Sequence, residues 1–119
     1  MISKTRIMLY PDNVQVVSSF WQDFFQAEII ETQKLPDSHL NITLRLNDTV
    51  ELSLFPKEFI AKYSPEILSN TPSLMLFSNQ FEELHQRIPG ALEIMSHNGL
   101  ESFPFPDPEG NYFVVAKTN

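Results

Sequence analysis

The chain has 119 residues, a length suited to one domain or to two small fused modules. It contains no cysteine, which excludes disulfides and zinc–thiolate sites and fits a reducing cytoplasm. A net charge of −7, with lysines and arginines scattered singly, argues against partners such as nucleic acid or an anionic membrane. Neither a signal peptide nor a run of about 20 apolar residues is recognisable, so we expect a cytoplasmic protein.

The first half of the chain predicts a strand, a helix and three more strands. Residues 6–10 (RIMLY) read as a short strand, and in the turn Pro11-Asp12-Asn13 the Asp or Asn side chain can cap the next helix. From Val14 to Phe25 apolar residues recur at three- and four-residue spacing, which predicts one buried helix face. The strands that follow are expected over residues 27–32, 40–46 and 50–55. The last two alternate apolar and polar residues on either side of a turn, which is typical of a half-buried hairpin.

The second half repeats this order after a connector. Residues 56–70 predict two short helical pieces that are separated before Pro65. A strand over residues 73–77 is followed by a helix that Asn79 caps and that carries Phe81, Leu84 and Ile88. Pro89-Gly90 interrupts this helix, and a further helical turn is expected over residues 92–95. The final strands are expected over residues 99–105 and 111–117. The segment SLMLFSNQFEEL echoes RIMLYPDNVQVV, which indicates an internal repeat.

The predicted fold class is therefore α+β, with paired βαβββ modules. Their curved antiparallel or mixed sheets are expected to form a cup with the helices packed outside. We assign residues 1–119 to a single domain. The first module takes residues 1–55, the helical connector residues 56–71, and a shortened second module residues 72–119.

The order of these motifs resembles the vicinal oxygen chelate superfamily of glyoxalases, bleomycin-resistance proteins and extradiol dioxygenases. RIMLYPDNV followed by SSFWQDFF resembles its first strand and helix, and VELSLF resembles its fourth strand. The ending FPFPDPEGNYFVV resembles its closing hairpin and is the most specific of the motifs. Where this superfamily usually has a glycine after the first helix, the chain has Gln26, so we expect that helix to end differently.

The resemblance implies positions for a metal site, and most of them have changed. Metalloenzymes of the superfamily hold a divalent cation with His and Glu side chains on the strands that face the cup. Carried over, these positions fall on Arg6, Glu51, Pro72 (Ser73 if the register slips by one) and Val114. Only Glu51 keeps a ligand type, so we expect no cofactor, with a divalent metal held partly by Glu51 as the alternative. The three histidines, His39, His85 and His97, are expected at the surface.

Alternation in the strands collects polar side chains on the face of the first sheet that turns away from the helices. The candidate ligand-binding residues on this face or at the rim of the cup are Arg6, Met8, Tyr10, Arg45, Ser53, Phe55 and Tyr112. Arg6 can pair with Glu51, and the guanidinium of Arg6 or Arg45 can bind an anion. Glu51 is the candidate catalytic base, although burial would raise its pKa and a nearby arginine would lower it. The alternative is that this face is simply solvated.

Aromatic side chains form the second expected part of the cup. Ten phenylalanines in this chain suggest a core and a pocket built from rings. The rings expected to line or rim the cup are Tyr10, Phe55, Phe77, Phe103, Phe105 and Tyr112. Those expected in the core are Phe20, Trp21, Phe24 and Phe25.

Two functions follow from the resemblance, and the sequence favours the first. One is metal-independent binding of a small planar or anionic molecule, as in bleomycin-resistance proteins. The other is a divalent-metal-dependent lyase, isomerase or dioxygenase with Glu51 as a ligand, so whether the chain is an enzyme stays open. A module that only dimerises is a third possibility. The resemblance also implies a homodimer.

Overall fold

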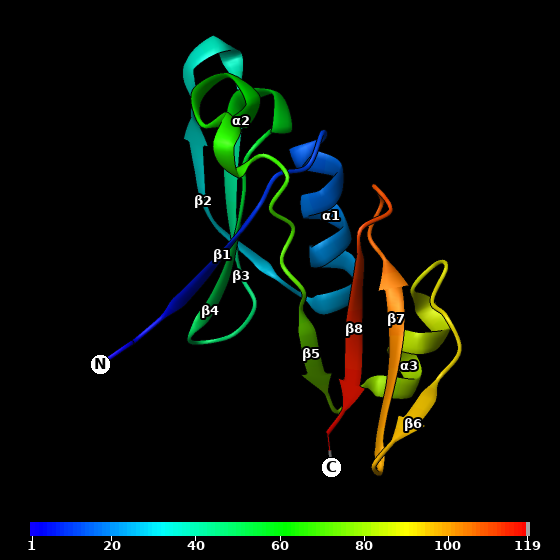
Figure 1. The fold of residues 1–119 in the computed structure, drawn as a ribbon. Helices are drawn as coiled ribbons and strands as arrows, with labels where there is room; N and C mark the ends of the chain where they lie inside the picture. The colour runs from blue at the N-terminus through cyan, green and yellow to red at the C-terminus, as the bar shows by residue number, and fades with distance from the viewer. Residues whose placement is uncertain (119) are drawn as a thin grey trace. The chain divides into compact units, whose positions relative to one another are not determined.

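The computed structural model describes residues 1–118, which form two compact units that divide between Pro72 and Ser73. Each unit contains one four-stranded sheet, and in each the chain order is strand, helix and three strands (Figure 1). This is the paired βαβββ architecture that the sequence predicts. None of the helices within residues 1–118 is long and apolar enough to cross a membrane.

The first unit combines a mixed sheet with one long helix. Its elements are β1 (Thr5–Leu9), α1 (Val14–Phe25), β2 (Glu28–Lys34), a 3₁₀ turn (Pro36–Ser38), β3 (Leu40–Arg45) and β4 (Val50–Leu54). The strand order is β1-β4-β3-β2, with β1 parallel to β4 and the other neighbours antiparallel. The connector continues this unit as α2 (Lys57–Tyr63) and a second 3₁₀ turn (Pro65–Ile67). Strand β1 is therefore an edge strand.

Helix α1 begins where the sequence predicts. The side chain of Asn13 accepts a hydrogen bond from the Val16 amide at 3.1 Å, which satisfies one of the free donors of the first turn. Val14, Val17, Phe20 and Trp21 of the apolar face are buried, with Trp21 fully enclosed, whereas Phe24 and Phe25, expected in the core, are only partly buried. The helix ends at Gln26, which takes the left-handed conformation (φ 56°) that glycine usually supplies. The helix end thus keeps its usual geometry, contrary to expectation, at the modest steric cost of placing a side chain there.

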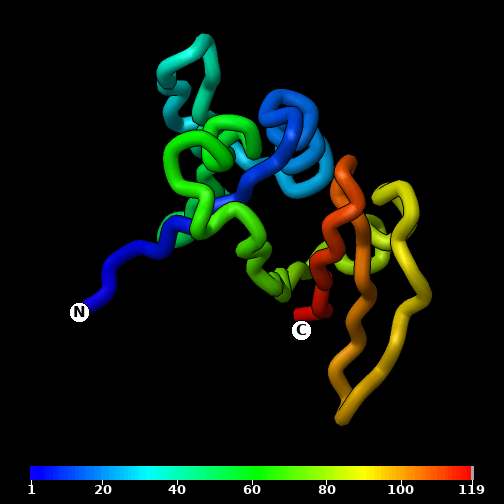
Figure 2. The backbone as a smooth tube through the Cα atoms, turned by 45° about the horizontal axis from the view of Figure 1, so that its top comes forward, coloured from blue at the N-terminus to red at the C-terminus, as the bar shows by residue number. Residues whose placement is uncertain are grey.

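The second unit repeats the topology with shorter elements. They are β5 (Met75–Ser78), α3 (Phe81–Arg87), β6 (Met95–His97), β7 (Leu100–Pro106) and β8 (Tyr112–Lys117). The strand order is β5-β8-β7-β6, and β5 is parallel to β8. The tube in Figure 2 follows this order from the yellow β6 to the red β8. The shortening comes from α3, with 7 residues against 12 in α1, and from β6, with 3 against 7 in β2; no strand is lost.

Two local predictions in the second unit are wrong. The N-cap residue of α3 is Gln80 and not Asn79, and its side chain makes no capping hydrogen bond. The Ser78 hydroxyl accepts from the Gln80 amide at 3.0 Å in the turn before the helix. Residues 92–95 form no helical turn, because the Leu92 amide donates to the Pro104 carbonyl at 2.9 Å and Met95 already begins β6.

The placement of two rings also differs from expectation. Phe103 and Phe105 do not line a cup but are fully buried in the core of the second unit. The Phe103 ring packs against Phe81 of α3, with 5.3 Å between centroids, and against His85, with 4.8 Å. His85 is correspondingly not a freely solvated histidine, and its Nε2 lies 2.9 Å from the Leu92 carbonyl oxygen. The register of β7 that decides which face carries the rings could not be fixed from the alternation alone.

Candidate functional site

Strand register gathers the polar side chains of the first unit on one face of its sheet. Arg6 of β1 lies opposite Glu51 of β4, which lies opposite Arg45 of β3. Two residues further along β4, Ser53 lies opposite Met8 of β1 on one side and Thr43 of β3 on the other. Because side chains alternate between faces, these residues share the face opposite Leu44 and Leu52.

Glu51 is the centre of a cluster of charges on this face. Its Oε1 accepts from Nε and Nη2 of Arg6, both at 2.9 Å, and its Oε2 lies 3.2 Å from Nζ of Lys4. Glu51 is 7% exposed, whereas the side chains of both cations are about half exposed. The Arg6 hydrogen bond is the main cause that lowers the pKa of Glu51, with Lys4 adding to it and burial opposing it. The arginine therefore outweighs burial, and Glu51 is a weaker base than an ordinary carboxylate.

These residues do not fit a divalent cation. Both carboxylate oxygens of Glu51 are held by cationic groups, and the guanidinium of Arg6 stands at the first expected ligand position. Pro72 and Val114 have no donor atom in their side chains. Within residues 1–118, no three His, Cys, Asp or Glu side chains converge as a cation would require. A cation brought to this place would meet positive charge first.

A buried hydrogen-bond network lies next to the charged cluster. The Asn41 amide donates to the Ser53 hydroxyl and to the Leu54 carbonyl, both at 2.9 Å. The hydroxyls of Thr43 and Ser53 are 3.0 Å apart, and both residues are almost fully buried. Ser53, expected to contact a ligand, is thus engaged within the sheet. This network satisfies its own polar groups and gives the sheet a fixed polar face.

Two of the other expected residues, Arg45 and Phe55, have partners of their own. Arg45 pairs with Glu28 across the exposed edge, with Nη2 2.8 Å from Oε2. Phe55 stacks on Phe59 of α2, with 6.2 Å between centroids. Tyr112 belongs to β8 of the second unit and is 55% exposed.

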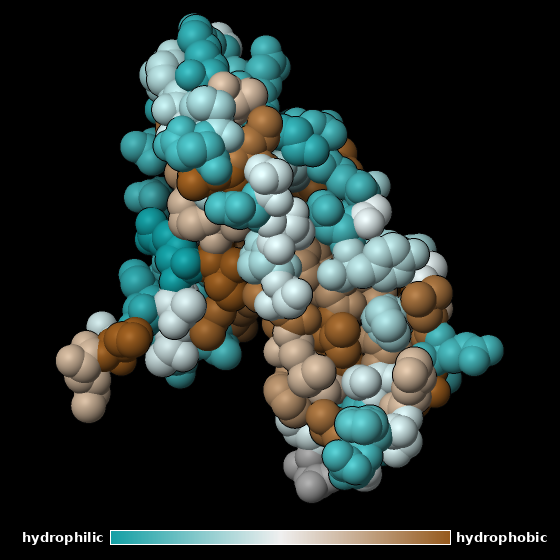
Figure 3. All heavy atoms as spheres, in the orientation of Figure 1, coloured by the Kyte–Doolittle hydropathy of each residue, from teal (hydrophilic) through white to brown (hydrophobic). Residues whose placement is uncertain are grey.

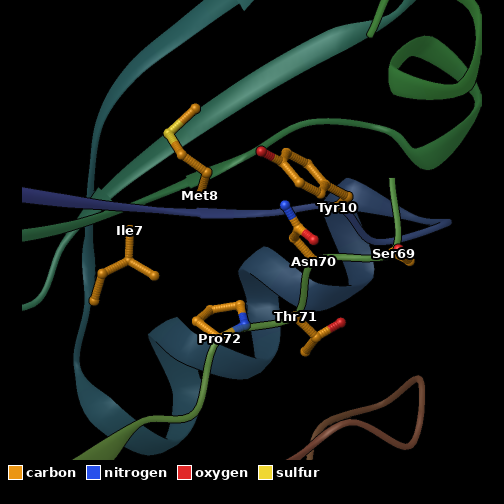
Figure 4. A pocket seen from close by; sticks show the side chains of 7 residues that line it. All are labelled: Ile7, Met8, Tyr10, Ser69, Asn70, Thr71 and Pro72. Carbon is orange, nitrogen blue, oxygen red and sulfur yellow. The ribbon is translucent and has the colours of Figure 1, made fainter. Parts of the chain in front are cut away.

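A pocket of about 520 Å³ opens beside β1 within the first unit. Its lining combines strand residues with the end of the connector: Ile7, Met8, Tyr10, Ser69, Asn70, Thr71 and Pro72 (Figure 4). Figure 4 shows Met8 and Tyr10 on one side of β1 and Ile7 on the other. This volume falls in the range of about 300–1,000 Å³ that is usual for small-molecule sites.

The pocket brings together two of the expected residues, Met8 and Tyr10, with a segment that the sequence did not indicate. Residues 69–72 have no regular structure, and the green connector runs past β1 in Figure 2. The one sequence signal was the polar run Ser69-Asn70-Thr71 after an apolar turn, which by itself is typical of any surface loop.

Comparison with known proteins identifies the fold. No family model matches the chain, and no curated protein matches it in sequence. Among solved structures, a lactoylglutathione lyase from Agrobacterium tumefaciens has a TM-score of 0.72 and 19% identity, over 95% of this chain and 91% of that one. A member of the glyoxalase/bleomycin resistance protein/dioxygenase superfamily from Sphaerobacter thermophilus has a TM-score of 0.76 and 12% identity, over 99% and 98% of the two chains.

A third similar structure is TnmS3, described as an antibiotic binding protein from Streptomyces sp. CB03234. Its TM-score is 0.75 at 11% identity, over 98% of this chain and 95% of that one. At such identities the likeness concerns the backbone and not the chemistry of the site. The order of the elements, the register of both sheets and these similarities together assign the chain to the vicinal oxygen chelate fold of the glyoxalase, bleomycin-resistance and dioxygenase superfamily.

Proposed function

We propose that this protein binds a small planar or anionic molecule without a metal, at the polar face of the first sheet and the pocket beside β1. The observation that carries the proposal is the Arg6–Glu51–Lys4 cluster, which puts positive groups around Glu51, the one residue that keeps a metal-ligand type in the resemblance. Beside it, Met8 and Tyr10 lead into a pocket of suitable volume. One antibiotic-binding structure of the same fold gives a precedent for such a role.

The expected mode of binding follows from these side chains. The Tyr10 ring offers a flat apolar surface, on which a planar ligand can stack. The side chains of Arg6 and Lys4 are about half exposed and share a single carboxylate, so the cluster keeps one net positive charge for an anionic group. Glu51 is not proposed as a catalytic base, because its lowered pKa makes the carboxylate a weaker proton acceptor.

Metal analysis tests the metal-independent part of the proposal. The protein would be purified, its metal content measured, and the metal-free protein titrated with nickel, zinc, manganese or iron. We expect less than stoichiometric metal and no saturable site. Stoichiometric metal that is lost in Glu51→Ala would contradict the proposal and would favour the alternative, a metal-dependent lyase, isomerase or dioxygenase.

Ligand binding is tested with a planar anionic probe, anilinonaphthalene sulfonate, followed by fluorescence titration. Tyr10→Ala and Arg6→Ala should each weaken the binding of the probe. Tyr63→Ala is the matched control, because it removes a half-exposed ring from α2 that does not line the pocket. Equal affinity in Tyr10→Ala, Arg6→Ala and the control would contradict the proposed site.

The proposal extends to assembly and location. We infer a cytoplasmic homodimer; the absence of cysteine supports the reducing compartment. Exposed apolar side chains on β5, β6 and β8, namely Met75, Phe77, Met95 and Tyr112, support association with a second copy. In sedimentation velocity we expect a dimer that Phe77→Lys shifts toward monomer. A wild-type protein that stays monomeric at every concentration would contradict this part.

A further inference from the structure

Strand β1 presents one edge to its sheet and the other edge to the pocket. The Thr5 amide donates to the Thr49 carbonyl at 2.8 Å, and the Leu9 carbonyl accepts from the Phe55 amide at 3.0 Å. In a parallel pair of strands, every second residue directs both its N–H and its C=O toward the same neighbouring strand. Thr5, Ile7 and Leu9 therefore face β4, and the N–H and C=O groups of Arg6, Met8 and Tyr10 point away from it.

Within the first unit this outer edge is unpaired. Strand β1 is the last strand of the order β1-β4-β3-β2, so no further strand of this unit pairs with it. Among residues 1–118, the backbone hydrogen bonds outside regular helices and strands include none from the N–H or to the C=O of Met8 or Tyr10. Open strand edges readily accept another extended segment.

The opposite wall of the pocket supplies further hydrogen-bonding groups. Ser69, Asn70 and Thr71 line it, and the side chains of these three residues take part in no hydrogen bond found among residues 1–118. In Figure 4 the amide of Asn70 points toward the side of β1 where Met8 and Tyr10 lie. A ligand between the two walls would meet backbone groups on one side and polar side chains on the other.

We propose that this pocket takes an extended, peptide-like ligand in which two secondary amides flank one side chain, and that this ligand adds to the outer edge of β1. The N–H of the amide before that side chain donates to the Met8 carbonyl, and the C=O of the amide after it accepts from the Met8 N–H, as in a hydrogen-bonded pair of antiparallel residues. The side chain of the ligand then lies beside Met8 and Tyr10. This inference rests on the proposed function and names the chemical class of the small molecule.

The pairing of a donor with an acceptor is what selects the amide class. A carboxylate could accept from the Met8 N–H, but it would then lie near the Met8 carbonyl with no proton to offer it. A purely aromatic molecule could stack on Tyr10, but it would leave both backbone groups of Met8 unpaired when it displaces water. An extended residue flanked by two amides satisfies both groups at once.

A matched pair of ligands tests the inference directly. The probe is N-acetyl-phenylalanine N-methylamide, and the control is the same compound methylated on the phenylalanine nitrogen, which removes the donor. Backbone amide NMR during titration should show the largest shift at Met8. We expect the methylated compound to bind about threefold to tenfold more weakly, which corresponds to the loss of one neutral hydrogen bond.

Variants of Met8 provide the second test. Proline is tolerated on edge strands where its missing N–H faces away from the sheet, so Met8→Pro removes the donor toward the pocket. Met8→Leu keeps the N–H and should keep the affinity ratio between the two compounds. Met8→Pro should weaken both compounds. If Met8→Pro fails to fold by circular dichroism, the ligand pair on the wild-type protein remains decisive.

The outcomes separate this inference from the proposed function. Equal binding of the two compounds would overturn the edge-pairing inference and leave small-molecule binding in place. Binding of anilinonaphthalene sulfonate at Tyr10 without binding of either amide would do the same. If neither the amides nor the sulfonate binds, the proposed function itself fails.

Discussion

The two sheets share a framework and differ on one face. Counting back from the helix caps Asn13 and Gln80 matches Ile7 with Leu74 and Leu9 with Leu76. Strand register then matches the remaining core positions, which are Leu52 with Phe113, Leu54 with Val115, Ile42 with Phe103 and Leu44 with Phe105. All of these positions are apolar in both units, because a helix packs on this face and excludes water.

The opposite faces have diverged in chemistry. Four charged or hydroxyl positions of the first sheet correspond to proline, valine or tyrosine in the second: Glu51 to Tyr112, Arg45 to Pro106, Thr43 to Pro104 and Ser53 to Val114. In Figure 3 the surface over the second unit's sheet is accordingly tan and brown, whereas teal gathers over β2. The two units therefore share apolar residues on the sheet face that the helix covers. On the opposite face their residues differ, and in the first unit that face carries the polar cluster.

The largest expected effect tests which face of the second sheet is its core. Phe103 is fully buried against Phe81, so Phe103→Ala should lower the free energy of unfolding by about 3–5 kcal/mol. Phe77 lies on the other face and is 58% exposed. Phe77→Ala should change stability by no more than about 0.5 kcal/mol in urea denaturation of the monomer. Similar losses in the two variants would contradict the assignment of the faces.

A smaller effect is expected from the buried polar network of the first sheet. Asn41→Ala removes the donor to Ser53 and to the Leu54 carbonyl and leaves both groups buried. We expect a loss of about 1–3 kcal/mol in the free energy of unfolding. Ser102→Ala, at the corresponding position of the second sheet, is the control and should cost less than about 1 kcal/mol, since that residue is only partly buried. If the control costs as much as Asn41→Ala, the polar network has no special role.

The charged cluster around Glu51 predicts that the stability of the first sheet depends on pH in the acid range. The second sheet has Tyr112 at the corresponding position and no carboxylate there. The pKa of Glu51 in the folded protein lies below its ordinary value of 4.5. Glu51 therefore contributes stability above that pH, and the contribution is lost as the pH falls through the lowered pKa. Glu51→Gln should flatten this part of the acid unfolding curve. Arg6→Met should raise the pKa of Glu51 in an NMR titration, and an unchanged value would refute the Arg6–Glu51 pair.

The smallest effect is expected at the rim of the polar face. Arg45 and Glu28 form an ion pair between two side chains that are each about half exposed or more. Such pairs contribute about 0–1 kcal/mol because water and salt screen them. Arg45→Ala should therefore change the unfolding midpoint little, and less still at high salt. A large loss would show that this arginine stabilises the face in some other way.

The framework could be predicted from the sequence because it rests on local patterns. The side chain of Asn13 caps α1 by accepting from the amide of Val16, only three residues along the chain. The alternation of apolar and polar residues predicts which face of the sheet each residue of β3 and β4 occupies. The second unit was harder to predict, because prolines at 104 and 106 interrupt the alternation that would have marked Phe103 and Phe105 as core. The resemblance placed the last metal-ligand position on Val114. In the strand register, however, the residue of the second sheet that corresponds to Glu51 of the first is Tyr112.

The site was predictable only in part. The pairing of Arg6 with Glu51 follows from two strands whose order the resemblance supplied. The balance between burial and the arginine on the pKa of Glu51 depends on distances and on exposure, which no sequence pattern encodes. The pocket beside β1 depends on the path of residues 69–72, and an irregular segment follows tertiary contacts and has no periodic signal of its own.

The parallel pairing of β1 with β4 has a consequence for how the first unit folds. Arg6 and Glu51 meet across 45 residues of chain, whereas β3 and β4 are joined by a short turn. Closing so long a loop has a larger entropic cost than closing a short turn, and this cost slows the pairing. We therefore expect the β3–β4 hairpin to form before β1 docks. During synthesis the first strand must therefore wait for β4 to leave the ribosome. Until then its apolar residues remain exposed to chaperones and to other nascent chains.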